Sequence, residues 1–248
     1  MAEQDAEKEP VTLAICIPAR DQVQTWFAYS LTLAVSYIAA KYDYVKCNLI
    51  VSNGTLVQEQ RTDLAKKALA SNASWVIYVD SDMRFPKNAF EQLVKHKKPI
   101  VAASYPTRKY PFIQPVTFRS DEGDERVYTR PESEGLEEVA STGFGLVAIH
   151  RSVFERVPQP WFYVPFDVAK NKFDCGEDIW FCRRAREAGF QVMIDHDLSK
   201  AVSHIGSMEW EHSHANSLVA LCDKRREMAE ETDLNCIDFS NLSTSSAA

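Results

Sequence analysis

The chain has 248 residues, of which 45% are hydrophobic and 25% charged, and its formal net charge is −7 at pH 7. This length allows one large domain or two small ones, and the composition is that of a soluble globular protein with a sizeable core. The negative charge argues against nucleic-acid binding through a broad positive field, although it leaves room for a local basic patch.

Targeting signals and a disulfide framework are both missing from the pattern. The first ten residues are acidic and lack the apolar core of a signal peptide, and no run approaches 18 apolar residues. The six cysteines are widely spaced without a CxxC pair, and several lie in apolar segments, as buried free thiols do. We therefore expect reduced cysteines and a cytoplasmic protein without a transmembrane segment.

Strands and helices alternate through the first hundred residues. Residues 11–18 form an apolar run typical of a buried strand, and residues 24–41 carry apolar side chains at helical spacing. The elements predicted next are a strand at 47–52, a helix at 58–70, a strand at 75–79, a helix at 85–96 with Pro86 just inside it, and a strand at 99–105. This alternation predicts an α/β fold, with a mainly parallel central sheet covered on both faces.

The pattern changes in the second half of the chain. Residues 119–138 hold eight acidic residues and almost no apolar ones, which predicts a solvated hairpin or mobile loop outside the core. Residues 141–157 predict a strand interrupted by glycines and a short helix, and residues 173–195 predict a helix that Gly189 closes, then a strand. The domain boundaries that we expect are a disordered N-terminus at 1–10, one domain at 11–236 and a flexible tail at 237–248.

Two carboxylates, Asp80 and Asp82, directly follow the buried strand predicted at 75–79. Ligands of open parallel sheets bind beyond the carboxyl ends of the strands. Two close carboxylates repel one another and resist burial unless a cation neutralises them. The Asp-x-Asp pattern therefore indicates a divalent metal, with the alternative that one Asp caps the following helix or turns the chain.

A second acidic pair, Glu177 and Asp178, opens the helix that Gly189 ends. Acids in a first turn also favour a helix through its dipole, which is the alternative explanation. With Arg184, the order Glu-Asp-x-x-aromatic-x-x-Arg-x-x-x-x-Gly resembles the acidic motif of inverting GT-A glycosyltransferases, particularly those of family 2. The resemblance implies a single Rossmann-like GT-A domain and catalytic roles for Asp178, as general base, and Glu177. Because Asp178 lies at a helix N-terminus, we expect its pKa to be lowered.

Other segments between residues 11 and 206 resemble the same family in the same order. They are the end of the first strand, the Asp-x-Asp turn, the segment Ser141–Arg151 and the late Ser203–Gly206. The residues expected at a nucleotide-diphosphate sugar are Pro18, Ala19, Arg20, Asp21, Asn53, Arg61, Asp80, Ser81, Gly143 and Phe144. The metal ligands that the resemblance implies are Asp82, Asp80 and His204.

The ligand chemistry leaves several alternatives open. Magnesium and manganese take few protein ligands and fill the rest with phosphate and water, and an imidazole favours manganese. We expect Mn²⁺ or Mg²⁺ and a UDP-sugar donor, with a GDP-sugar as the alternative. His204 could instead be a hydrogen-bonded structural residue, and Arg61 could pair with Asp63 or Glu59 rather than reach the diphosphate.

These features predict a metal-dependent glycosyltransferase that moves a hexosyl or related group to an acceptor hydroxyl. The segment at 53–65 looks most like small stand-alone transferases of phage and bacterial genomes. The alternatives are a phage enzyme that modifies a DNA base and an inactive domain that only binds nucleotide sugars. A nucleotidyltransferase is disfavoured because residues 17–25 contain no glycine. The acceptor, which could be a glycan, lipid, protein or modified base, stays open, as do the stereochemical outcome and the oligomeric state.

Overall fold

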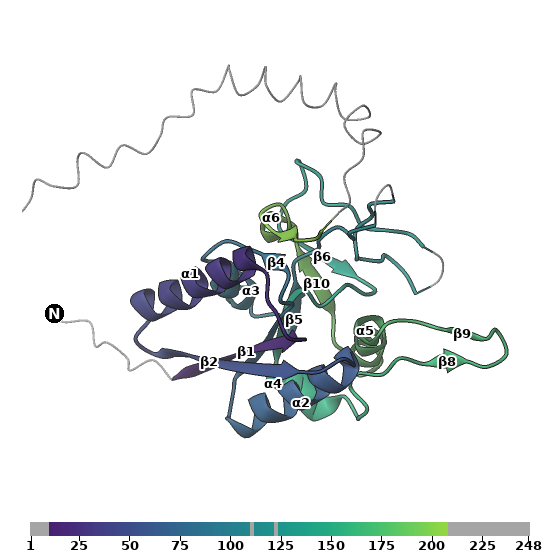
Figure 1. Ribbon diagram of the computed structural model, residues 1–248, viewed down its shortest axis with the longest axis horizontal. Helices are drawn as coiled ribbons and strands as arrows, with labels where there is room; N and C mark the ends of the chain where they lie inside the picture. Colours follow the sequence, from purple (N-terminus) through teal and green to yellow (C-terminus); the bar gives the residue numbers. More distant parts are fainter. Residues whose placement is uncertain (1–9, 110–111, 122–123, 208–248) are drawn as a thin grey trace, which may run out of the picture. The chain divides into compact units, whose positions relative to one another are not determined.

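Helices lie on both sides of a central sheet in the computed structural model, which describes residues 10–109, 112–121 and 124–207 (Figure 1). The seven strands of this sheet follow the order β2-β1-β3-β7-β5-β10-β6. Their bounds are β1 Val11–Ala19, β2 Val45–Asn53, β3 Trp75–Val79, β5 Ile100–Ala102, β6 Leu136–Val139, β7 Leu146–His150 and β10 Val192–Asp195. The described residues up to Gly206 pack as one compact unit.

Most strands of the sheet share one direction. β1 is parallel to β2 and β3, and β10 is parallel to β5. β7 lies antiparallel between β3 and β5, and β6 is antiparallel to β10. Five strands therefore run one way and two the other, so the predicted α/β class with a mainly parallel sheet is confirmed.

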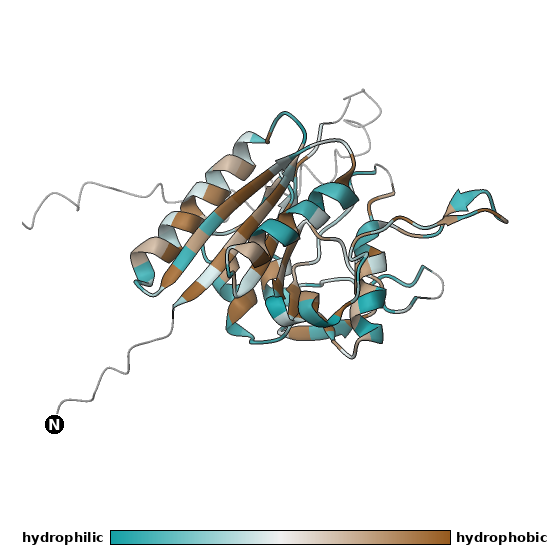
Figure 2. Cartoon of the chain, turned by 90° about the horizontal axis from the view of Figure 1, so that it is seen from below, coloured by the Kyte–Doolittle hydropathy of each residue, from teal (hydrophilic) through white to brown (hydrophobic). Residues whose placement is uncertain are grey.

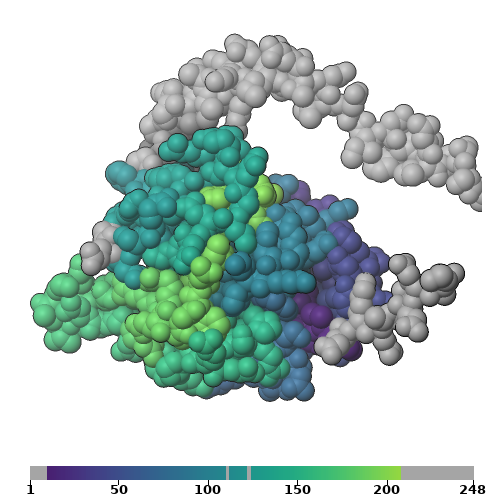
Figure 3. Space-filling view, turned by 180° about the vertical axis from the view of Figure 1, so that it is seen from behind, coloured from purple at the N-terminus to yellow at the C-terminus, as the bar shows by residue number. Residues whose placement is uncertain are grey.

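The helices and the remaining short strands complete the architecture. The helices are α1 Thr25–Lys41, α2 Val57–Ala70, α3 Ala89–Lys95, α4 Arg151–Arg156, α5 Glu177–Glu187 and α6 His196–Ser199. Two small ribbons pair β4 Met83–Arg84 with β11 Ser203–His204, and β8 Phe166–Asp167 with β9 Lys172–Phe173. The β8–β9 hairpin projects from the body of the chain (Figures 1 and 3). None of the helices in the described ranges is long and apolar enough to cross a bilayer.

The core lies on both faces of the sheet because successive side chains of a strand point to opposite sides. On β1, Cys16 packs with Leu64 of α2 and with residues of α5, whereas Ile15 packs with Phe27 of α1 and with residues of α3. Both β1 side chains are fully buried. The continuous apolar run of β1 therefore forms a strand that helices cover on both faces of the sheet, as the sequence predicted.

Two expectations about individual elements are wrong. Pro86 does not lie inside the helix, because its carbonyl accepts from the amide of Ala89 in a turn and α3 begins only there. The acidic segment 119–138 is not wholly outside the core either. Val127 is 1% exposed, and residues from Leu136 onward form β6 at the edge of the main sheet. The two carboxylates of β6 are consecutive and lie between Leu136 and Val139, so the segment shows neither the apolar run nor the alternation that predicts a strand.

Some expectations lie partly or wholly outside the described residues. The disordered N-terminus, apart from Pro10, and the flexible tail at 237–248 are outside them, and so is the 208–236 part of the predicted domain. The cysteines that the structure describes, Cys16, Cys47, Cys175 and Cys182, are free thiols. Burial raises the pKa of the Cys16 and Cys182 thiols to about 12, so both stay protonated near neutral pH.

Candidate functional site

The carboxyl ends of β1, β2 and β3 meet at one edge of the sheet. Ala19 lies in register with Asn53, and the Gln60 side chain donates to the carbonyls of Ala19 and Ser52, which ties the two strand ends together. The Gln24 amide donates to the Ser81 carbonyl, 3.0 Å away, which joins the loop after β1 to the Asp-x-Asp turn. The residues at these strand ends that we expect to bind the nucleotide-sugar donor therefore lie along one edge of the sheet.

The first-strand residues differ in accessibility. Pro18 is buried within the sheet, whereas Arg20 and Asp21 are exposed in the loop that follows β1. Asn53, at the end of β2, is exposed too. Arg20, Asp21 and Asn53 are accessible to a ligand, and Pro18 contributes by fixing the strand end.

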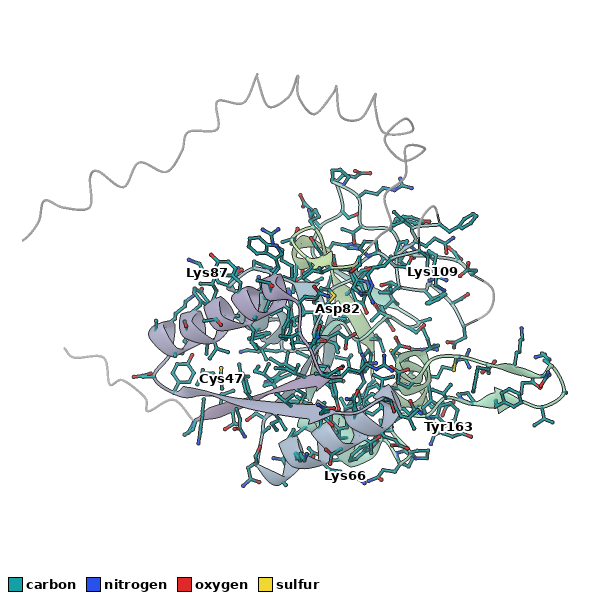
Figure 4. The ribbon with its side chains drawn as sticks, viewed as in Figure 1. Cys47, Lys66, Asp82, Lys87, Lys109 and Tyr163 are labelled. Carbon is teal, nitrogen blue, oxygen red and sulfur yellow. The ribbon has the colours of Figure 1, made fainter. Side chains whose placement is uncertain are left out.

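The two carboxylates of the Asp-x-Asp turn have different partners. The turn is closed by the Met83 amide, which donates to the Asp80 carbonyl at 3.1 Å. The Asp80 carboxylate accepts from Arg61 at 2.8 Å, and the Asp82 carboxylate accepts from Arg108 at 2.8 Å. Asp82 is labelled near the centre of the view in Figure 4. The turn therefore presents its two acids to two separate sets of side chains.

Arg61 connects the Asp-x-Asp turn with the acidic motif. It is 3% exposed, and its two terminal nitrogens pair with Asp80 and with Glu177, which lies 116 residues further along the chain. The guanidinium lies 5.6 Å from the centre of the Phe144 ring. Burial opposes the charge of Arg61, but the two carboxylates outweigh it and raise its pKa. The expected alternative, a pair with Asp63 or Glu59, is not what the structure shows.

Asp178 sits beside this ion triad at the start of α5. Its carboxylate accepts from the Ile179 amide at 2.8 Å. Burial, together with the charge of Glu177, raises the pKa of Asp178 to about 6. The expected lowering of this pKa is therefore wrong, because burial and a neighbouring carboxylate outweigh Arg61 and the helix terminus.

His204 approaches Asp82 from the end of the described chain. β11 pairs with β4, and the Ile205 amide donates to the Asp82 carbonyl at 2.7 Å. The Nδ1 atom of His204 lies 3.0 Å from the Pro106 carbonyl oxygen, to which it donates. Its Nε2 atom is 3.6 Å from Oδ1 of Asp82. The segment around His204 thus meets the Asp-x-Asp turn, more than a hundred residues earlier in the chain, at the Asp82 carboxylate.

This pair fits a divalent cation. A histidine that binds a metal usually donates its other ring N–H to a carbonyl or carboxylate, as His204 does to Pro106. Ligands about 2.1 Å from one ion lie at most about 4.2 Å apart, so a separation of 3.6 Å between Nε2 and Oδ1 is compatible with both atoms binding it. Within the described ranges, no three His, Cys, Asp or Glu side chains cluster for a metal. Asp80, expected as a further ligand, pairs through Oδ1 with Arg61 at 2.8 Å.

Two residues that we expected to contact the nucleotide-sugar donor, Gly143 and Phe144, are buried and out of reach of a ligand. Phe144 is fully buried and stacks with Tyr78 and Phe162, so it supports Arg61 rather than lining a pocket. Gly143 is also buried, and a Cβ atom there would lie 2.5 Å from the hydroxyl of Tyr105. The expectation that this segment lines a donor pocket is corrected accordingly.

Tyr105 and Arg108 are residues of this edge that the sequence analysis missed. The Tyr105 hydroxyl accepts from the Gly145 amide at 3.0 Å, and its ring meets the His204 ring edge to face at 5.0 Å. The glycines of Gly143-Phe144-Gly145 were the available signal, because repeated glycines mark close approach of another group. Arg108 lies among the many cations of residues 84–109, and no motif distinguished it from the others.

Two cavities open near these groups. One of about 320 Å³ is lined by residues around the start of α5, including Asp121, Asp174, Gly176, Ile179 and Arg183. Another of about 310 Å³ lies beyond β5 and is lined by residues including Tyr105, Pro106, Tyr128 and Lys200. Both volumes are in the range of small-molecule sites.

Neither a scan against models of known protein families nor a search of curated proteins finds a match for this chain. Among solved structures, the A197 protein from STIV is similar at 15% identity and a TM-score of 0.48, with 81% of this chain and 97% of that chain covered. TarS from S. aureus is similar at 13% identity and a TM-score of 0.44, over 79% of this chain and 60% of that chain.

A third similar structure is a mutant Drosophila β-1,4-galactosyltransferase 7 in complex with manganese, UDP-Gal and xylobiose. It matches at 15% identity and a TM-score of 0.44, over 79% of this chain and 71% of that chain. One of these three similar structures is thus a galactosyltransferase. The case for an activity rests on the side chains of this chain.

Proposed function

We propose that the chain is a metal-dependent glycosyltransferase that moves a sugar from a nucleotide-diphosphate donor to an acceptor hydroxyl. The observation that carries the proposal is the convergence at one sheet edge of three motifs that are distant in sequence. Arg61 joins Asp80 to Glu177, and His204 approaches Asp82. Each motif has a local structural explanation alone, but none of these explanations accounts for the three lying together.

Asp82 and His204 would hold the cation, and diphosphate and water would complete its shell. When bound, Mn²⁺ or Mg²⁺ neutralises charge that develops on a leaving diphosphate. The Asp82 carboxylate is suited to this role, because pairing with His204 and Arg108 outweighs burial and lowers its pKa. Arg108, which is 45% exposed on its side chain, supplies a second positive group beside the same carboxylate.

Asp178 is the proposed general base. The acceptor oxygen attacks the anomeric carbon, the bond from that carbon to the diphosphate oxygen breaks, and the acceptor proton passes to Asp178. A base is most effective when its pKa lies near the working pH, and burial with the charge of Glu177 brings the pKa of Asp178 to about 6. Glu177 is bound to Arg61, so its proposed role is to hold α5 against the Asp-x-Asp turn.

The cavity at the start of α5 is the proposed acceptor site, because Gly176 and Ile179, which flank Asp178 closely in sequence, line it. Its wall carries Asp174 and Arg183, paired at 2.8 Å, and Asp121. Carboxylates and a guanidinium can hydrogen-bond to hydroxyl groups, whereas two carboxylates would repel a polyanion. This favours a neutral, hydroxyl-bearing acceptor over DNA.

The test is nucleotide release. The chain is incubated with manganese and a panel of UDP- and GDP-sugars, and free nucleotide diphosphate is measured with and without candidate acceptors. We expect release from one donor, lost on chelation and in Asp82→Asn. Asp63→Asn is the matched control, since Asp63 is about half exposed and pairs with Lys67 at the surface. Donor binding without release from any acceptor would favour the inactive binding domain.

His204→Ala separates the metal role from a structural one. If His204 binds the cation, isothermal calorimetry shows weaker manganese affinity in the variant while the melting temperature stays close to that of the parent. Unchanged manganese affinity with a large fall in melting temperature would contradict the metal role and make His204 a structural residue.

A further inference from the structure

The edge strand β2 and the neighbouring helix α1 form a face that is unusually poor in charge. A quarter of the chain's residues are charged, yet the only charged residues in these two elements are Lys41 and Lys46. Neither element carries a carboxylate. In Figure 2, α1 is largely white and brown, with few hydrophilic residues. A solvated face normally carries charges of both signs, so this face has the composition of a contact surface.

β2 also exposes apolar side chains and an unpaired backbone edge. Leu49 is 46% exposed and Val51 is 57% exposed. β2 is the last strand of the sheet, and in the part of the chain that the structure describes no strand pairs with its outer side. A nine-residue edge with apolar side chains is a template for another strand. Natural edge strands prevent such pairing with charged side chains, and Lys46 is the one charged residue of β2.

We infer that two copies of this chain pair through β2, antiparallel about a twofold axis, to form a dimer with a continuous sheet. This inference is independent of the proposed function. A strand is the occupant that satisfies the free N–H and C=O groups of the edge. A membrane surface cannot do so, because the hydrocarbon core offers no partner for an open sheet edge.

The sequence of β2 matches its own antiparallel copy. Leu49 is the middle residue of Val45–Asn53, so a full-length pairing places Leu49 opposite Leu49 of the second copy and Cys47 opposite Val51. These three side chains lie on the α1 side of the sheet, where Cys47 packs with the core beneath α1. Leu49 of each copy would therefore cover Leu49 of the other, and Val51 would pack on Cys47 of the other copy.

Charge favours this pairing as well. Two copies that each carry a formal net charge of −7 repel one another, and β2 and α1 add no carboxylate of their own to the contact. Glu91 of α3, whose carboxylate reaches α1, is paired with Lys41 at 2.8 Å. In the antiparallel register Lys46 lies opposite Ser52, so the two Lys46 residues are about 20 Å apart along the strands. That distance exceeds the Debye length of about 8 Å in physiological salt.

The helix beside the strand extends the same surface. α1 contacts β2, and Leu31 and Val35, one turn apart on α1, are only half-buried although they pack on the core. Ala28 and Thr32 on the outer surface are small, so a second helix can approach closely. Pairing of β2 would bring the α1 helices of both copies to the same face of the extended sheet.

The first test is the molar mass of the full chain by light scattering during gel filtration. We expect twice 28.1 kDa for the parent and a twofold lower mass for Val51→Asp. Val168→Asp is the matched control, since Val168 is 84% exposed on the β8–β9 hairpin and the substitution is the same; it should remain dimeric. A monomeric parent, or a Val51→Asp variant that stays dimeric, overturns the inference.

Cross-linking tests the register and does not depend on how Val51→Asp folds. Opposed residues of antiparallel strands have Cα atoms about 4.5 to 5.5 Å apart, which suits a disulfide. Leu49→Cys should therefore form an intermolecular disulfide under mild oxidation, seen as a doubled mass on a non-reducing gel. The parent, whose Cys47 would face Val51, should not. Absence of the Leu49→Cys cross-link overturns the proposed register. Pelleting of a monomeric parent with anionic vesicles would overturn the dimer in favour of a membrane contact.

Discussion

Replacing Arg61 should destabilise the fold by several kilocalories per mole, in a way that depends on pH. The Arg61 side chain is 4% exposed, and its partners Asp80 and Glu177 are 27% and 12% exposed. Arg61→Met keeps much of the apolar volume but leaves two carboxylates near one another without a cation. Breaking a buried ion pair by removing one partner costs about 3 to 5 kcal/mol.

The cost of protonating a carboxyl group gives a loss of stability of the same size. The variant can protonate one carboxyl group instead of burying two charges. Protonating a group of ordinary pKa about 4 costs about 4 kcal/mol at pH 7 and about 1.4 kcal/mol at pH 5. Burial already raises the pKa of Asp80 in the parent, and losing the Arg61 charge raises it further, so the loss of stability is largest at high pH and shrinks as the pH falls. The deficit should fall by at most about 3 kcal/mol between pH 7 and pH 5, because the raised pKa of Asp80 gives the parent part of the same pH dependence.

Urea unfolding at both pH values measures this deficit as the difference between variant and parent. Lys67→Met is the matched control on the same helix: Lys67 and its partner Asp63 are about half exposed, and such pairs contribute less than about 1 kcal/mol. If Arg61→Met stayed within 1 kcal/mol of the parent at pH 7, or lost as much at pH 5 as at pH 7, the triad would not be the buried link between the two acidic motifs.

Three further predictions follow from the geometry. With the pKa of Asp178 at about 6, the transfer rate should rise about tenfold per pH unit below pH 6 and level off above it. Asp178→Asn should lower the rate by about 10² to 10⁴ and abolish this pH dependence. Near-parental turnover of the variant would contradict the role of Asp178 as general base. Because the folded pKa of Asp178 is raised, its ionisation opposes folding as the pH rises, so Asp178→Asn should be more stable than the parent at pH 8 in thermal unfolding; equal or lower stability would refute the stated cause of the shift. Gly143→Ala and Gly145→Ala should each cost about 1 to 3 kcal/mol through overpacking. Tyr105→Phe should recover more of the loss at Gly143, where the nearest contact of a Cβ would be the hydroxyl at 2.5 Å, than at Gly145, where ring carbons at 2.6 and 2.7 Å lie closer than the hydroxyl at 2.8 Å. Equal rescue at both positions in urea unfolding would refute this contact.

Local sequence was enough for most of the fold. Apolar runs gave the strands β1 and β3, and apolar side chains at helical spacing gave α1. The position of Asp80 and Asp82 just beyond a buried strand also followed from the sequence, because a parallel sheet brings strand ends to a common edge. These are properties of a segment and its immediate neighbours, which the chain order encodes directly.

The direction of β7 and the presence of β6 in the sheet were decided by tertiary pairing. β7 lies antiparallel between two parallel strands, and its apolar run is the same in either direction. β6 lies in an acidic segment and is held by β10, from which it is separated by about fifty residues. Direction and partner choice depend on the whole sheet, so the pattern within one strand does not contain them.

The site divides in the same way. The sequence marked the acids and His204, but only the folded chain joins Arg61 to both acidic motifs and buries Phe144 beneath it. The raised pKa of Asp178 likewise depends on burial and on the charge of Glu177 rather than on its helix position alone. Ion pairing and desolvation depend on distances between distant segments, and those distances exist only once the sheet has assembled.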